Sequence, residues 1–62
     1  MKRQWLIDAR KAKGLTQAQL AKLTDSTVQS ISNYETGFRQ PKPAIAKRIG
    51  KTLGIDWTKF YE

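Results

Sequence analysis

The chain has 62 residues, and its 12 Lys and Arg outnumber its 5 Asp and Glu, which gives a formal net charge of +7. A chain this short buries only about 60% of its unfolded surface, so we expect a single domain over residues 1–62 and no second one. The absence of Cys and His excludes disulfides and Cys/His zinc sites, and the positive charge favours an anionic partner, either nucleic acid or an acidic membrane surface.

Two helical segments are predicted in the first third of the chain. The first spans about residues 2–13 and ends at Lys13–Gly14, because a cation followed by glycine is a common helix stop. Its start, Lys2 and Arg3, is expected to fray, with a short arm as the alternative. The second begins at Thr16, because TQAQ matches a capping box. Its apolar stripe is Leu20, Ala21 and either Leu23 or Thr24.

Three further segments follow a polar turn at 24–27, which makes five in all. The third runs over 28–36, or ends one residue earlier, and is closed by Gly37. The fourth runs over 43–53, beginning with a proline and followed by a glycine, as helices often do. The last is a short aromatic turn capped by Asp56. No segment is typical of a strand, so the predicted fold class is all-α.

The third segment has an unusual outward face for a basic protein. At about 100° per residue, Ile31 and Tyr34 fall on one side, which we expect to be buried. Gln29 and Asn33 fall opposite, and Ser30 lies on an edge. The predicted exposed face, called the polar strip below, consists of Val28, Gln29, Ser32 and Asn33.

The polar strip has the chemistry of a surface that reads DNA bases. The donor and acceptor fork of Gln or Asn matches adenine in the major groove, Ser pairs with several base edges, and a Val methyl meets the thymine methyl. Lys would bind phosphate and carry little sequence information. The alternative is local: STVQ at the start of this segment is also a capping box, in which Gln29 bonds back to Ser26.

The stretch TQAQLAKLTDSTVQSISNYETG, Thr16–Gly37, resembles the helix-turn-helix of the phage repressor and Cro family (XRE type). KGLT before it, and GFRQP and LGIDW after it, extend the resemblance over nearly the whole chain. It implies a compact five-helix domain whose third helix enters the major groove while the second crosses the backbone. It also implies a sequence-specific regulator of transcription, a small Cro-like repressor of a phage or mobile element. Such a protein binds near-palindromic double-stranded DNA as a homodimer that is a monomer when free.

The resemblance assigns roles residue by residue. The positions that match family base contacts are Val28, Gln29 and Asn33, with Ser32 beside them. The expected phosphate contacts are Gln17, Ser30, Arg39, Gln40 and Lys42. Arg10 and Glu35 match an ion pair between the first and third helices, so we expect substitutions of either residue to impair folding.

The turn departs from the family pattern at two positions. The usual Leu-Gly is Thr24–Asp25 here, so Asp25 must accept a left-handed backbone or the turn must differ. The apolar residue that usually follows is Ser26, which predicts a thinner core beneath the turn.

Other function classes have less support. The scattered acidic residues and the lack of a glycine-rich phosphate loop argue against an enzyme, so we expect no catalytic residues, metal, cofactor or small-molecule substrate. The alternative is a protein-interaction module of the same fold, an antitoxin or adaptor, that uses the aromatic C-terminal end. Trp57 and Phe60 are expected to cover the core, whereas Tyr61 or one face of Trp57 is a candidate dimer patch.

The longest apolar feature near the start, WLI at Trp5–Ile7, is far shorter than a signal-peptide core or a membrane span of about 20 residues. We therefore expect a cytoplasmic protein of a bacterial host that joins the nucleoid when bound to DNA and does not associate with membranes.

Overall fold

The computed structural model describes residues 2–62, so Met1 of the expected domain lies outside the described residues. Four α-helices are followed by a 3₁₀ helix, in the order α1 (Gln4–Ala12), α2 (Gln17–Leu23), α3 (Val28–Thr36), α4 (Pro43–Leu53) and η1 (Trp57–Tyr61). The all-α class is confirmed, since residues 2–62 contain no strand. The last segment, expected as a short turn capped by Asp56, is five residues of 3₁₀ helix, a form that proteins use in short pieces. The implied count of five helices is met only when this 3₁₀ helix is included.

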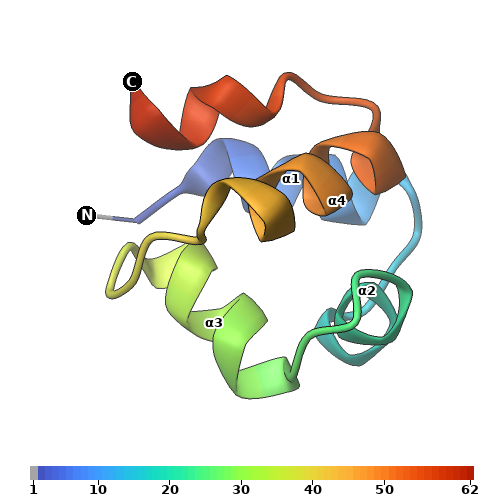
Figure 1. Ribbon diagram of the computed structural model, residues 1–62. Helices are drawn as coiled ribbons and strands as arrows, with labels where there is room; N and C mark the ends of the chain where they lie inside the picture. The colour runs from blue at the N-terminus through green and yellow to red at the C-terminus, as the bar shows by residue number, and fades with distance from the viewer. Residues whose placement is uncertain (1) are drawn as a thin grey trace.

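The arrangement places α2 and α3 together at one end of the molecule, α1 and α4 across its middle, and η1 at the opposite end (Figure 1). The Cα atoms fill 25 × 21 × 20 Å. No helix among residues 2–62 has the length and apolar character needed to cross a bilayer.

The first helix starts later than predicted. The α1 helix begins at Gln4 and not at Lys2, because the backbone N–H of Arg3 donates to the Glu35 carbonyl at 2.7 Å. A contact with the end of α3 therefore fixes this start, and nothing in the local sequence indicates it.

The two helices of the predicted helix-turn-helix are capped by side chains. The predicted capping box at Thr16 is confirmed: its hydroxyl accepts from the Gln19 N–H at 3.1 Å, and the side-chain Oε1 of Gln19 accepts from the Thr16 N–H at 2.8 Å. The α3 helix is capped by Thr27, whose hydroxyl accepts from the Ser30 N–H at 3.0 Å. The alternative box between Ser26 and Gln29 does not form, because the cap lies one residue later.

The turn between these helices keeps the geometry that a glycine usually provides. Asp25 has φ of +57°, the left-handed backbone that its position requires. The Ser26 N–H then donates to the Ala21 carbonyl at 2.7 Å. Thr24 is fully buried beneath the turn, and its hydroxyl donates to the Leu20 carbonyl at 2.8 Å. A satisfied hydroxyl thus occupies the space under the turn.

One apolar cluster joins all the elements. Its buried members are Leu6, Leu20, Ala21, Ile31, Ala46, Ile49, Leu53 and Phe60. Of the two alternatives that the sequence left open on α2, Thr24 is buried and Leu23 is 60% exposed. On α4, Ala46 is buried and Ile45 is half-buried. On α3 the buried residues are Ile31 and Glu35, and Tyr34 is half-buried, so the core side of this helix includes a charge.

The α4 helix and the segment after it pack too closely for a side chain at Gly50. A Cβ atom there would lie 2.8 Å from the Ile55 carbonyl oxygen and 3.0 Å from the Trp57 Cβ. This close approach brings η1 back over the core, where Phe60 is buried.

Candidate nucleic-acid interface

The polar strip lies on the outer side of α3, and two of its side chains are bonded to each other. Val28 is 47% exposed and Gln29 is exposed, whereas Ser32 and Asn33 are half-buried. The Gln29 Nε2 donates to the Asn33 Oδ1 at 3.1 Å. In this arrangement the Gln29 Oε1 keeps its acceptor capacity and the Asn33 Nδ2 keeps its donors. The Gln29 oxygen and the Asn33 amide nitrogen are therefore available to other partners, and the bond between the two side chains restrains their positions.

A shallow hollow of about 430 Å³ lies beside the strip, between α3, the loop after it and the start of α4. We call it the basic hollow. It is lined by Ser30, Asn33, Tyr34, Arg39, Gln40, Lys42 and Ile45. Four of the five expected phosphate contacts thus share one hollow with Asn33 of the strip, and both of its cations belong to the loop.

The fifth expected phosphate contact, Gln17, is not part of this group. Its Nε2 donates to the Glu35 Oε1 at 2.8 Å. This bond ties the start of α2 to the buried face of α3. One N–H of the amide nitrogen is therefore used inside the protein, and only the second is free for a phosphate.

Glu35 and Arg10 form a buried ion pair between α3 and α1, as the resemblance implies. The Arg10 Nε and the Glu35 Oε2 are 2.6 Å apart, and the two side chains are 11% and 3% exposed. The Arg10 Nη1 also donates to the Leu15 carbonyl at 2.8 Å. In the described part of the chain no buried side-chain N or O atom lacks a hydrogen bond. This network sets the position of α3 relative to α1 and α2.

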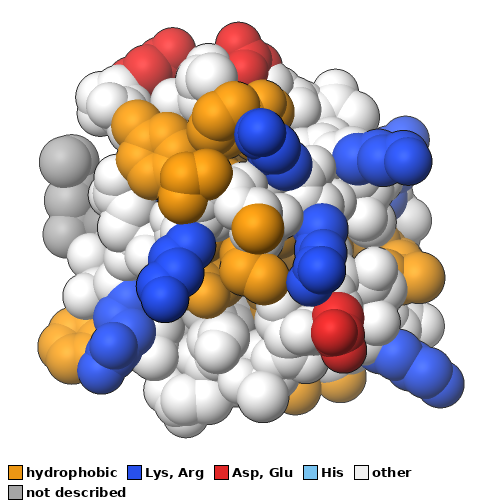
Figure 2. All heavy atoms as spheres, viewed as in Figure 1, with side chains coloured by type: hydrophobic (Ala, Val, Ile, Leu, Met, Phe, Trp, Pro, Cys, Tyr) orange, Lys and Arg blue, Asp and Glu red, His pale blue; other side chains and the backbone are white. Residues whose placement is uncertain are grey.

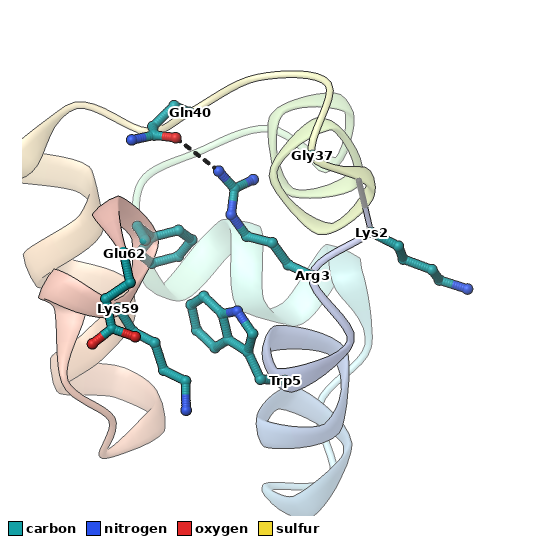
Figure 3. Close-up of a pocket in the computed structure, with 8 residues that line it drawn as sticks. Lys2, Arg3, Trp5, Gly37, Gln40, Lys59 and Glu62 are labelled. Atoms are coloured by element: carbon teal, nitrogen blue, oxygen red, sulfur yellow. Dashed lines mark hydrogen bonds between the residues drawn. The ribbon is translucent and has the colours of Figure 1, made fainter.

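Arg3 has a role that the sequence interpretation missed. It was expected in a frayed end or arm, but its Nη1 donates to the carbonyls of Tyr34 and Arg39 at 2.6 and 3.1 Å. Its Nη2 donates to the Gln40 Oε1 at 3.0 Å (Figure 3). The only sequence signal is the residue type, because a guanidinium has five N–H donors in a fixed fork.

The aromatic end makes several contacts within the chain. The Tyr61 hydroxyl donates to the Pro41 carbonyl at 2.6 Å, although the residue is 40% exposed. The Lys47 Nζ lies 5.1 Å from the centre of the Trp57 ring, and Trp57 meets Tyr61 edge-on with ring centres 6.0 Å apart. The two residues of the candidate dimer patch are therefore neighbours, with Tyr61 the more exposed.

Positive charge is spread over the face that carries α4 and the loop after α3, where Figure 2 shows Lys and Arg side chains at several points. The polar strip itself contains no Lys or Arg. This separation of the cations from an uncharged strip is expected when phosphate contacts orient a protein on DNA and base contacts give its specificity.

Comparisons with known proteins agree with this geometry. The family model described as helix-turn-helix matches residues 6–60. The chain is 40% identical over 62 residues to the uncharacterized HTH-type transcriptional regulator YqaF of Bacillus subtilis (strain 168), covering 100% of this chain and 82% of that protein. It is 36% identical over 50 residues to the putative multi-protein-binding factor 1 of Yarrowia lipolytica (strain CLIB 122 / E 150), covering 81% of this chain and 33% of that protein. No solved structure matches.

Proposed function

Because the chain belongs to the XRE-type helix-turn-helix family, we propose that it is a transcriptional regulator that binds double-stranded DNA in a sequence-specific way. This family is one of DNA-binding regulators and is generally non-enzymatic. The finer proposal is a small Cro-like repressor from a phage or mobile element.

The Gln29–Asn33 pair beside the basic hollow supports this function most strongly. The Asn33 Nδ2 has donors for adenine N7, and the Gln29 Oε1 has acceptor capacity for adenine N6. The bond between the two side chains restrains both before DNA arrives, so less rotamer freedom is lost on binding. Val28 adds methyl groups suited to thymine, and Ser32 adds a hydroxyl.

The basic hollow gives this surface its orientation. With α3 in the major groove, Arg39 and Lys42 meet phosphates beside the groove, and Ser30 and Gln40 add uncharged hydrogen bonds. These contacts bind any sequence and carry most of the salt dependence. Specificity then comes from the strip alone.

Two copies are proposed to bind a near-palindromic operator. Major grooves on one side of B-DNA recur about every 34 Å. A molecule whose Cα atoms span 25 Å in its longest direction, with side chains added, fits one half-site beside a second copy. The exposed ring of Tyr61, next to Trp57, is a candidate contact between copies.

The test is selection of bound duplexes from a randomised pool at about physiological salt. Wild type is compared with Gln29→Ala/Asn33→Ala, and Gln4→Ala is the matched control because Gln4 makes the same kind of exposed i, i+4 bond, to Asp8 on α1. Wild type and Gln4→Ala are expected to enrich one short, near-palindromic motif, and the double variant is expected to lose it while its circular dichroism stays helical. Enrichment of the same motif by the double variant would contradict the role of the strip, and no enrichment by wild type would overturn the function.

A second candidate is a protein-interaction module of the same fold. It is favoured by the name of the second relative, a putative multi-protein-binding factor, and by the exposed Tyr61 ring. In that case Tyr61→Ala would abolish binding of the partner protein and Gln29→Ala would not. The opposite pattern, with motif selection dependent on Gln29, excludes this candidate as the main function.

A further inference from the structure

The loop over residues 37–42 carries the two cations of the basic hollow, yet it belongs to no helix. We propose that Arg3 and Tyr61, from the two ends of the chain, are positioning residues that hold this loop in its DNA-binding shape. This inference rests on the proposed function and extends it to residues outside the helix-turn-helix.

Arg3 holds the first half of the loop. Its guanidinium bonds the carbonyls of Tyr34 and Arg39 and the side chain of Gln40. Figure 3 shows it reaching toward Gln40 from the start of the chain. Three acceptors are thus gathered by one planar group, a geometry that the single ammonium of Lys does not reproduce. The Gln40 side chain, a candidate phosphate contact, is fixed by the same group.

Tyr61 holds the second half. Its hydroxyl donates to the carbonyl of Pro41 at 2.6 Å, and Pro41 is itself fully buried. Pro41 lies between the candidate phosphate contacts Gln40 and Lys42. A bond at its carbonyl therefore fixes the backbone from which both side chains extend.

Arg3 also contacts the 3₁₀ helix that carries Tyr61. The Arg3 Cζ lies 5.4 Å from the centre of the Phe60 ring, and Phe60 packs edge-on against Trp5 with ring centres 5.0 Å apart. The start of the chain and η1 therefore meet beneath the loop, around a second hollow of about 460 Å³.

The other hydrogen bonds made by N–H groups of the loop join it to α3. The Gly37 N–H donates to the Tyr34 carbonyl at 3.4 Å, the Phe38 N–H to the Thr36 hydroxyl at 3.4 Å and the Arg39 N–H to the Asn33 carbonyl at 3.2 Å. None of these reaches Gln40 or Pro41, which Arg3 and Tyr61 bond. Fixing a backbone costs conformational entropy, and a surface that is ordered before binding avoids this cost when the partner arrives. Releasing either anchor should therefore weaken DNA binding without changing which bases are preferred.

The test measures affinity for the duplex that wild type selects, with Tyr61→Phe and Arg3→Lys as the variants. Tyr61→Phe keeps the ring and removes only the hydroxyl, while Arg3→Lys keeps the charge and removes the fork. Each is expected to weaken binding about two- to tenfold, the effect of one or two hydrogen bonds, with the selected motif unchanged. Amide hydrogen exchange in the free protein should become faster at Arg39, whose N–H is bonded to the Asn33 carbonyl. Lys2→Gln is the control for charge near Arg3, and it should alter neither the exchange nor the motif.

A double-mutant cycle separates positioning from general destabilisation. If Tyr61 acts through the loop, Tyr61→Phe should weaken binding less in a Lys42→Ala background than in wild type, because Lys42 extends from the backbone that the Pro41 bond fixes. Equal losses in both backgrounds would overturn the positioning role of Tyr61.

Other outcomes overturn the proposal in distinct ways. If Tyr61→Phe and Arg3→Lys both bind DNA with wild-type affinity and show unchanged amide exchange, the loop needs no anchor. Arg3 would instead be a direct phosphate contact if Arg3→Lys keeps the wild-type affinity, while Arg3→Gln weakens DNA binding and lowers the salt slope by about one. Loss of self-association in Tyr61→Phe by analytical ultracentrifugation would assign the hydroxyl to a dimer contact. If wild type selects no motif, the proposed function itself fails, which the other outcomes do not imply.

Discussion

Arg10 and Glu35 show at the level of single residues how a charge can serve folding in a DNA-binding domain. Their guanidinium and carboxylate are buried and share hydrogen bonds with Leu15 and Gln17. A buried charge that loses its partner is strongly destabilising, whereas replacing both partners with apolar groups is far less so. The pair therefore fixes α3 against its neighbours.

We expect Arg10→Met and Glu35→Leu each to lower the free energy of unfolding by about 3–5 kcal/mol. In a chain of this size that is enough to unfold much of the protein. The combined variant should lose clearly less than the sum of the two, because no unpaired charge remains. Urea unfolding followed by circular dichroism measures all three, and a fully additive double variant would contradict the coupling.

Asp25 is the second decisive residue, because its φ of +57° lies where β-branched side chains are strained. Asp25→Val is expected to be about 1–2 kcal/mol less stable than Asp25→Gly, the size of the left-handed penalty. Thermal unfolding of the two variants measures this difference. Equal stability would mean that the turn relaxes to another backbone conformation.

At the scale of elements, side-chain caps mark the starts of α2, α3 and η1. Asp56 caps η1, where its Oδ1 accepts from the Thr58 N–H at 3.0 Å and from the Thr58 hydroxyl at 2.7 Å. These bonds, the one to the hydroxyl first, hold the pKa of Asp56 below its ordinary value of 3.8. The ionised carboxylate therefore stabilises η1, and with it the position of Tyr61.

A carboxylate whose folded pKa is lowered contributes stability above its unfolded pKa and loses it as the pH falls through the folded value. We expect the protection of the Thr58 amide, its exchange rate relative to the intrinsic rate at the same pH, to be lost as the pH falls below 3.8, the ordinary pKa of Asp56. Asp56→Asn should lack this pH dependence, which separates Asp56 from the other carboxylates. NMR of the Thr58 amide from pH 6 to about pH 2 is the measurement, and an identical profile in Asp56→Asn would contradict the assignment.

At the scale of the whole molecule, a net charge of +7 attracts DNA, and only some of the charge forms contacts. Arg39 lines the basic hollow, whereas Lys11 is exposed on α1 and lies outside it. Measuring DNA affinity at several salt concentrations therefore distinguishes cations that contact phosphate from cations that only add to the long-range attraction.

Affinity for DNA is expected to fall as salt rises, with a slope of about −0.9 per phosphate contact on a logarithmic plot. Arg39→Ala should reduce this slope by about one and weaken binding almost equally for all sequences. Lys11→Ala should leave the slope unchanged. Fluorescence anisotropy titrations at several salt concentrations test both, and equal slopes for Arg39→Ala and wild type would remove Arg39 from the interface.

Much of the local structure was predictable because it depends on residues within one or two turns of each other. The capping box at Thr16 and the start of α4 at Pro43 follow from nearby side chains and backbone preferences. Helical spacing likewise placed Ile31 in the core and Gln29 on the surface. These features of the fold, and with them the polar strip of the candidate site, were determined by the sequence itself. At Asp25 the sequence left two outcomes open, a left-handed backbone or a different turn, and the structure has the left-handed backbone.

The partners of the long polar side chains were decided only by the tertiary structure. Arg3 bonds residues 31 to 37 positions away, Tyr61 a residue 20 away and Gln17 a residue 18 away. A hydrogen bond needs its atoms within about 3 Å, and helical periodicity does not tell which distant segments meet at that distance. The start of α1, the use of Gln17 inside the protein and the anchoring of the loop after α3 therefore depend on how the helices pack.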